Sequence, residues 1–159
     1  GRHKCGGLFF RSHNVMESFD SLYKKLMRYC AYQERSESEV RLKLRTLAAP
    51  AALGESVLKK LREENFVNEE RFARAYVRGK FRINAWGRLK IRNGLRAKGV
   101  DEKLISRALN EEIDEKQYQE AMRKVVAEKG LKTAFSRGFE VNRNFGNAIS
   151  SLYSSGEEE

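Results

Sequence analysis

The sequence has little cysteine, histidine or proline, and each shortage excludes a class of protein. Its 159 residues include only two cysteines, Cys5 and Cys30, which cannot make a disulfide framework, so we expect a reducing cytoplasm. Both histidines, His3 and His13, lie near the start, so a hydrolase built on a Ser–His or Cys–His pair would have to draw its base from that segment. The single proline, Pro50, leaves helix open to the backbone almost everywhere else.

Other absences narrow the function further. No run approaches the roughly 20 apolar residues that cross a bilayer, and residues 1–15 lack the apolar run of a secretory signal, so we expect no membrane contact. There is no Gly-rich phosphate loop, and the set His3, Cys5 and His13 lacks the paired spacing of a zinc site. Three acidic pairs could be offered as acid–base groups, but adjacent helix residues point about 100° apart. We therefore expect these pairs to cap helix starts or stay solvated, in a protein that is not an enzyme and holds no cofactor: Glu63-Glu64, Glu69-Glu70 and Glu111-Glu112.

Positive charge is concentrated in one part of the chain. The sequence has 32 Lys+Arg against 22 Asp+Glu, a formal net charge of +10. The window 71–98 has ten Lys/Arg and no Asp or Glu, so the remaining 22 basic and 22 acidic residues cancel. Such a density repels itself, and an acidic partner would relieve that repulsion.

Helical spacing places these cations on two helices. Arginines at steps of three and four would share one side of a helix, and those at steps of four would share one side of the next. Apolar residues mark the opposite sides, so both helices are predicted to bury one face and expose the other. The first set is Arg71, Arg74, Arg78 and Arg82 opposite Phe72 and Tyr76; the second is Arg88, Arg92 and Arg96 opposite Ile91 and Leu95.

Helix signals recur along the chain and no strand signal competes with them. Apolar residues recur at three and four rather than two, so the pattern predicts an all-α protein. Asn68, Asp101 and Asp114 are predicted N-caps, each with a flanking aliphatic staple, and Gly99 and Gly130 are predicted helix ends. About nine helices are expected. They lie near residues 18–34, 37–48, 54–65, 69–83, 87–98, 102–112, 115–129, 131–137 and 143–153.

The helices fall into groups of three. Anchors in the first helices are spaced by 44 and 46 residues: Ala31-Tyr32, Ala75-Tyr76 and Ala121-Met122. Anchors in the third helices are spaced by 47 and 44: Val57-Leu58, Leu104-Ile105 and Ala148-Ile149. A period near 45 predicts three tandem three-helix, helix-turn-helix-like repeats in an elongated, curved body. The predicted parts are an N-terminal extension or expression remnant at 1–15, repeats at 16–66, 67–112 and 113–153, and an acidic tail at 154–159.

The stretch 65–100, NFVNEERFARAYVRGKFRINAWGRLKIRNGLRAKGV, resembles the core signature of the RecX family of recombination regulators. The resemblance covers about 22–153 and departs from the family at 48–54, where a short Lys-Gly-type turn is usual, and at 141–147. The matching positions are Phe66-Val67-Asn68-Glu69, Arg71-Phe72-Ala73, Tyr76-Val77-Arg78 and Leu95-Arg96-Ala97-Lys98-Gly99.

The resemblance implies three tandem repeats and a regulator that binds the RecA recombinase. RecX-like proteins lodge in the groove of the RecA–DNA filament and suppress filament growth, strand exchange and ATPase activity in DNA recombination and repair. We expect a monomer whose basic window binds acidic filament surface, DNA phosphates, or both. The predicted binding residues are Arg71, Arg74, Arg78, Lys80, Arg82, Arg88, Lys90, Arg92, Arg96 and Lys98.

A second interpretation is a helix-turn-helix protein that binds a specific DNA sequence, with helix 87–98 in the major groove. Steep salt dependence with little sequence preference would instead favour contact with the DNA backbone. Trp86 and Phe81 lie among the arginines and could stack on bases, although large aromatic residues in small helical units are more often core.

Overall fold

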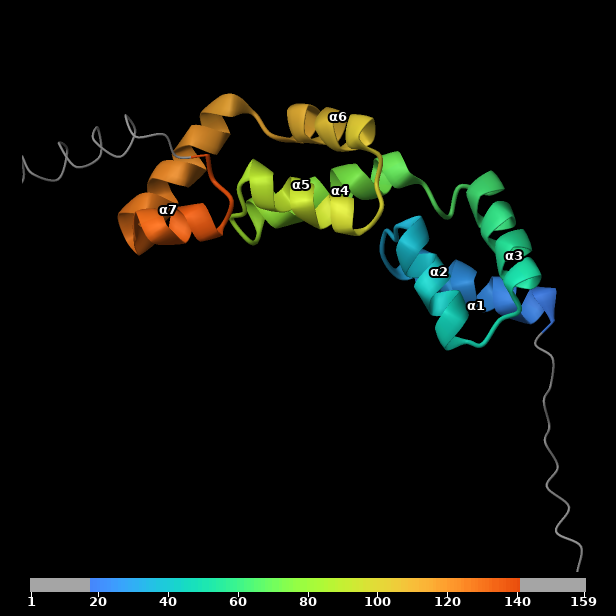
Figure 1. Cartoon of the computed structure of the whole chain (residues 1–159). Coiled ribbons are helices and arrows are strands. Elements are labelled where there is room, and N and C mark those ends of the chain that lie inside the picture. Colours follow the sequence, from blue (N-terminus) through green and yellow to red (C-terminus); the bar gives the residue numbers. More distant parts are fainter. Residues whose placement is uncertain (1–17, 141–159) are drawn as a thin grey trace, which may run out of the picture.

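The computed structural model describes residues 18–140, and these form seven α-helices and no strand (Figure 1). The helices are α1 (Phe19–Tyr32), α2 (Glu37–Thr46), α3 (Ala51–Glu63), α4 (Glu69–Arg82), α5 (Arg88–Ala97), α6 (Glu102–Glu112) and α7 (Glu115–Ser136). The all-α prediction is confirmed. The predicted helix 143–153, the extension 1–15 and the tail 154–159 lie outside the described residues. Within 18–140, no helix has the length and apolar character needed to span a bilayer.

The helices form an elongated row, with α1–α3 at one end, α4–α6 in the middle and α7 at the other end (Figure 1). We call α1–α3 the N-terminal triplet and α4–α6 the central triplet. The N-terminal triplet encloses one apolar core, which includes Leu22, Leu26 and Leu58. The central triplet encloses a second core, to which α7 contributes Tyr118 and Met122. The row therefore has two cores, and α7 shares the core of the central triplet.

Each predicted N-cap is confirmed. Asn68 accepts a hydrogen bond from Arg71 N–H at 2.9 Å, Asp101 from Lys103 N–H at 2.8 Å, and Asp114 from Gln117 N–H at 3.1 Å. The staple at Asn68 is wrong, because Val67 lies in the first core and Phe72 in the second. Val100 and Ile105 share one core, as do Ile113 and Tyr118, in agreement with the other two staples.

Several helices end on a residue with a positive φ, which lets the next N–H reach back to the last turn. Gly99 has φ 76°, as its sequence position predicts, and Ala48 takes the same role after α2 with φ 53°. Ala48 lies in the stretch 48–54, where the sequence departs from the resemblance, and it takes a left-handed conformation that favours glycine. Gly130 has φ 81° and ψ 163° inside α7, so the predicted break between 115–129 and 131–137 is confirmed. Helix α3 begins at Ala51 rather than 54, directly after Pro50, whose fixed φ suits a helix start.

The repeat is longer than the sequence pattern indicated. The N-caps Ser18 and Asn68 are 50 residues apart, and the residues before α3 and α6, Pro50 and Asp101, are 51 apart. Only the step from Asn68 to Asp114, at 46 residues, matches the predicted period. The pairing of Ala31-Tyr32 with Ala75-Tyr76 is therefore wrong. A shift of 50 places Tyr76 over the buried Leu26, whereas Tyr32 ends α1 and is 85% exposed.

The central triplet and α7 meet through two glycines. Gly87 N–H donates to Arg137 O at 2.7 Å, and Leu89 N–H donates to Gly138 O at 3.2 Å, so the chain after α7 satisfies the start of α5. A Cβ on Gly87 would lie 2.2 Å from Gly138 O, closer than any side chain can approach. Next to this contact Tyr118 stacks on Phe81, with ring centroids 6.1 Å apart, and its ring lies tilted against that of Phe139, with centroids 5.3 Å apart.

Candidate functional site

The two basic helices bury the faces that the sequence predicts. Phe72 on α4 and both Ile91 and Leu95 on α5 are buried, and Tyr76 is half-buried against the same core. The predicted arginines lie on the other faces and are partly exposed: the side chain of Arg78 is 43% exposed and that of Arg96 is 54% exposed. The apolar and basic sides of both helices are therefore confirmed.

The cations on α4 have acidic partners from distant parts of the chain. Glu112 at the end of α6 is 7% exposed at its side chain and accepts from Arg74 Nε at 2.7 Å and from an Arg78 guanidinium nitrogen at 3.1 Å. Burial alone would raise the pKa of Glu112, but the two guanidinium groups outweigh it and hold that pKa below its usual value. Arg71 donates to Glu34, in the loop between α1 and α2, at 2.6 Å.

The cations on α5 are paired in the same way. Arg96 Nε lies 2.8 Å from Glu102, Arg92 contacts the same carboxylate, and Arg88 lies 2.8 Å from Glu115. The hydrogen bond from Arg96 is the main reason that the pKa of Glu102 is lowered. The window 71–98 has no acidic residue in sequence, yet the fold brings carboxylates to it. For most of the row, carboxylates of this chain therefore already relieve the repulsion that was expected to require an acidic partner.

Three of the ten predicted binding residues lack the ion pair that the other seven form within residues 18–140. Within residues 18–140, no carboxylate forms an ion pair with Lys80, Arg82 or Lys90. Lys80 Nζ lies 4.7 Å and Lys90 Nζ 4.5 Å from the ring of Trp86. We call Lys80, Arg82 and Lys90 the unpaired cations. Phe81 is 7% exposed and belongs to the core, as expected, whereas Trp86 is only partly buried against it.

The contact between the N-terminal and central triplets is polar. Lys98, after α5, donates to Glu39 of α2 at 2.7 Å, and its carbonyl accepts from Ser38 Oγ at 2.7 Å. Glu37 N–H donates to Glu69 at 3.1 Å. Burial opposes ionisation of Glu39, but hydrogen bonds from Lys98 and from Ser36 N–H hold its pKa below the usual value. No apolar core crosses this boundary in the described residues, because the two clusters of buried side chains are separate.

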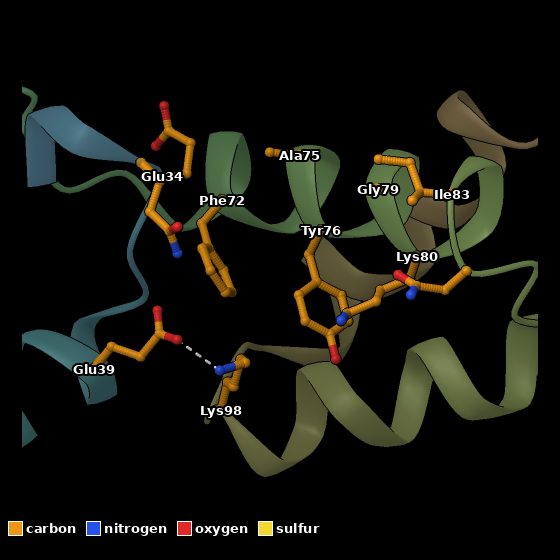
Figure 2. Close-up of a pocket in the computed structure, with 11 residues that line it drawn as sticks. Glu34, Glu39, Phe72, Ala75, Tyr76, Gly79, Lys80, Ile83 and Lys98 are labelled. Atoms are coloured by element: carbon orange, nitrogen blue, oxygen red, sulfur yellow. Dashed lines mark hydrogen bonds and ion pairs between the residues drawn. The ribbon is translucent and has the colours of Figure 1, made fainter.

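A groove of about 440 Å³ lies at this boundary (Figure 2). We call it the junction groove. Helix α4 supplies one wall, the loop after α1 supplies Glu34, and α2 supplies Glu39, which lies beside Lys98 and is joined to it by a dashed line (Figure 2). The α4 wall contains Phe72, Ala75, Tyr76, Gly79, Lys80 and Ile83. Sequence reasoning missed this site except for two of its cations, Lys80 and Lys98. The signals available were the glycine inside a predicted helix and an isoleucine at its end.

Neither a metal site nor a reactive thiol is present among residues 18–140. No group of three or more His, Cys, Asp or Glu side chains within 18–140 could hold a metal ion. His3, Cys5 and His13 lie outside the described residues. Cys30 is buried, and this burial raises the pKa of its thiol to about 11, which makes it a poor nucleophile. The acidic pairs are placed at helix ends and in ion pairs rather than in a shared cleft; Glu112, for example, is held by Arg74 and Arg78.

Comparison with known proteins places the central triplet in a defined family. Residues 68–109, from the N-cap of α4 to the last buried leucine of α6, match the family described as RecX, second three-helix domain. Curated proteins named regulatory protein RecX are similar over longer stretches. The chain is 42% identical to that of Geobacillus kaustophilus over 89 residues, or 56% of this chain and 33% of the relative. It is 33% identical to that of Clostridium acetobutylicum over 119 residues, or 73% of this chain and 55% of the relative.

Solved structures of RecX proteins are also similar to this chain. The crystal structure of a regulatory protein RecX is 25% identical, with a TM-score of 0.71 over 84% of this chain and 73% of that one. The crystal structure of RecX from Lactobacillus salivarius is 27% identical, with a TM-score of 0.64 over 88% of both chains. The chain belongs to the RecX family. It spans between a third and about half of the length of the curated RecX relatives that it matches. The unpaired cations and most of the junction groove lie within the residues that match the second RecX domain.

Proposed function

We propose that this chain binds the RecA recombinase in its filament on DNA and modulates RecA, mainly by inhibiting its recombinase and ATPase activities. The observation that carries the proposal is the match of residues 68–109 to the second RecX domain, because that stretch also holds the whole basic window 71–98. The chain acts by binding alone and needs no cofactor. A protein that prefers one state of a filament, or caps its end, shifts the filament population without any chemistry.

The shape and charge of the chain are consistent with this role. An elongated row can contact more than one filament subunit, so that several weak contacts add through linked binding (Figure 1). The unpaired cations bear positive charge that no carboxylate in 18–140 neutralises, so they are the parts of the basic window best able to attract acidic protein surface or DNA phosphate. In each of the seven paired cations, a carboxylate of this chain already offsets part of the positive charge.

The test is a RecA ATPase assay on single-stranded DNA with substoichiometric amounts of the full chain. We expect the wild type to inhibit. A variant with Lys80→Gln, Arg82→Gln and Lys90→Gln should need about tenfold more protein for the same inhibition, since losing about 1.4 kcal/mol of binding is a factor of ten. The matched control carries Lys103→Gln, Lys116→Gln and Lys132→Gln, three exposed cations on α6 and α7 with the same total charge change. Absence of inhibition by the wild type would contradict the proposal.

Charge reversal on α5 is a poor test of the same surface. Glutamate at Arg92 or Arg96 would face Glu102, so loss of function could reflect a weakened fold. The same pairs bear on the alternative of a sequence-specific DNA-binding protein. Arg92 and Arg96 are engaged with a carboxylate of their own chain, so nothing in the described residues favours their reading bases in a major groove.

A further inference from the structure

The junction groove exposes apolar surface that this chain does not cover. Ile83, at one end of the groove, is 84% exposed although it follows directly after a helix whose apolar face is buried. The half-buried Tyr76 projects from α4 into the same groove, and one edge of Phe72, which is otherwise buried in the core, lines it (Figure 2). Aliphatic and aromatic surface gathered beside a hollow is characteristic of a protein-binding site.

Gly79 exposes the backbone of α4 to the groove. It lies inside α4, where glycine weakens a helix relative to alanine. A Cβ on Gly79 would meet no atom within 4 Å, so packing within this chain does not require glycine there. Gly94 on α5 is different, because a Cβ there would lie 2.3 Å from the hydroxyl of Tyr76. Gly94 makes room for a side chain of this protein, whereas Gly79 leaves the α4 backbone open toward the groove.

The charges of the groove select the chemistry of an occupant. Its two carboxylates are already neutralised: Glu34 pairs with Arg71 at 2.6 Å, and Glu39 pairs with Lys98 at 2.7 Å. Lys80 has no carboxylate partner within 18–140 and lies between the rings of Tyr76 and Trp86, at 5.4 and 4.7 Å. The groove therefore offers an apolar surface, an open stretch of backbone and one uncompensated positive charge.

We propose that the junction groove binds a protein segment that carries an aliphatic side chain next to an aspartate or glutamate. The segment packs its backbone against Gly79, places its aliphatic side chain on Ile83 and Tyr76, and pairs its carboxylate with Lys80. The inference rests on the proposed function, because the segment belongs to the recombinase in the filament. A nucleic acid fits this chemistry less well, since an apolar wall with a single unpaired cation suits a side chain better than a phosphate backbone.

The first experiment fills the space above Gly79. RecA filaments are assembled on immobilised oligothymidine, and binding of the full chain is measured for the wild type, Gly79→Ala and Gly79→Leu. Both variants should fold, because a Cβ meets nothing there and helix propensity improves. We expect Gly79→Leu to bind at least about tenfold more weakly and Gly79→Ala to show a smaller loss, with unchanged circular dichroism. The control Ala52→Leu adds the same side chain to an exposed position of α3 and should bind normally.

The outcomes separate the two proposals. If the wild type binds and Gly79→Leu binds equally well, the groove is not the site, and the proposed function stands. If the wild type does not bind the filament, the proposed function and the partner assigned to the groove both fail.

The second experiment identifies the occupant. A benzophenone is attached at Ile83→Cys in a Cys5→Ser background, where the buried Cys30 should react little. We expect light-dependent cross-linking to a recombinase segment with adjacent aliphatic and acidic residues. Cross-linking to the oligothymidine, to a second copy of this chain or to residues 141–159 would overturn the assignment.

Discussion

The two junctions of the row are built in opposite ways. Where α7 meets the central triplet, aromatic rings stack and Gly87 touches Gly138, with apolar side chains of both parts in one core. Where the N-terminal triplet meets the central triplet, the contacts are ion pairs and hydrogen bonds such as that of Lys98 with Glu39. A shared apolar core resists separation of its parts, whereas partly exposed ion pairs contribute little and are screened by salt.

The two junctions should therefore differ in how easily the parts they join can move. The central triplet and α7 should behave as one unit, while the N-terminal triplet can change its orientation at modest cost. The junction groove lies at the weaker boundary, with walls from both triplets (Figure 2). A binding segment would therefore stabilise one orientation of the triplets.

The largest effect should come from closing the space between the two glycines. Gly87→Ala would put a Cβ 2.2 Å from Gly138 O and 2.4 Å from Phe139 N, so the central triplet and α7 must move apart. We expect the free energy of unfolding to fall by about 3 kcal/mol or more, in the range of severe core substitutions. Urea denaturation followed by circular dichroism measures this. A decrease in the free energy of unfolding of less than about 1 kcal/mol would show that this junction accommodates the added Cβ. The two junctions would then not differ in the way described.

Salt should act on the other junction. Dyes at Ser56→Cys on α3 and Asn110→Cys on α6, in a Cys5→Ser background, report the distance across the polar boundary. In about 1 M salt the screening length falls to about 3 Å, so we expect energy transfer to change as the triplets separate. A second pair, Asn110→Cys with Lys129→Cys on α7, should not respond. Equal responses of the two pairs would contradict the comparison.

Acid should have a smaller effect at the same boundary, through Glu39. Its pKa is held below the usual value of a glutamate because hydrogen bonds from Lys98 and Ser36 N–H outweigh the effect of burial. A carboxyl with a lowered pKa in the folded state stabilises that state above its unfolded pKa, and this contribution is lost as pH falls through the folded pKa. The dye pair across the polar boundary should therefore separate below about pH 4.5. Lys98→Met should weaken this pH dependence, and an unchanged profile would exclude Glu39 as its source.

The smallest effect concerns Gly79. Gly79→Ala should raise the free energy of unfolding by about 0.5–1 kcal/mol, because alanine favours helix and its Cβ enters open space. Thermal unfolding measures this directly. A destabilised Gly79→Ala would mean that the glycine serves the fold, and the contrast drawn between Gly79 and Gly94 would then be wrong.

The sequence predicts the local features well and the long-range ones poorly. The caps at Asn68 and Asp114 depend on side chains three residues from the backbone they satisfy, so a short pattern is sufficient to find them. The partner of Arg74 is Glu112, 38 residues away, and no local pattern indicates that pairing. The repeat period failed because Tyr32 and Tyr76 look alike in sequence but differ in burial.

The candidate site shows the same limit. The basic window and the burial of Phe72 could be predicted, since both follow from composition and helical spacing. The sequence could not predict which cations remain unpaired, because this depends on carboxylates that α6, α7 and the N-terminal triplet bring to the basic window. The junction groove requires the orientation of two triplets, which sequence periodicity does not contain.

Hydrogen–deuterium exchange on the full chain, alone and bound to RecA filaments, tests the central claim most directly. Amides open to solvent in the unbound chain exchange more slowly when a partner covers them. We predict new protection in residues 75–84, which include Gly79 and two of the three unpaired cations, and none in α3. Protection confined to α3 or α7, with 75–84 unchanged, would contradict the proposed binding surface.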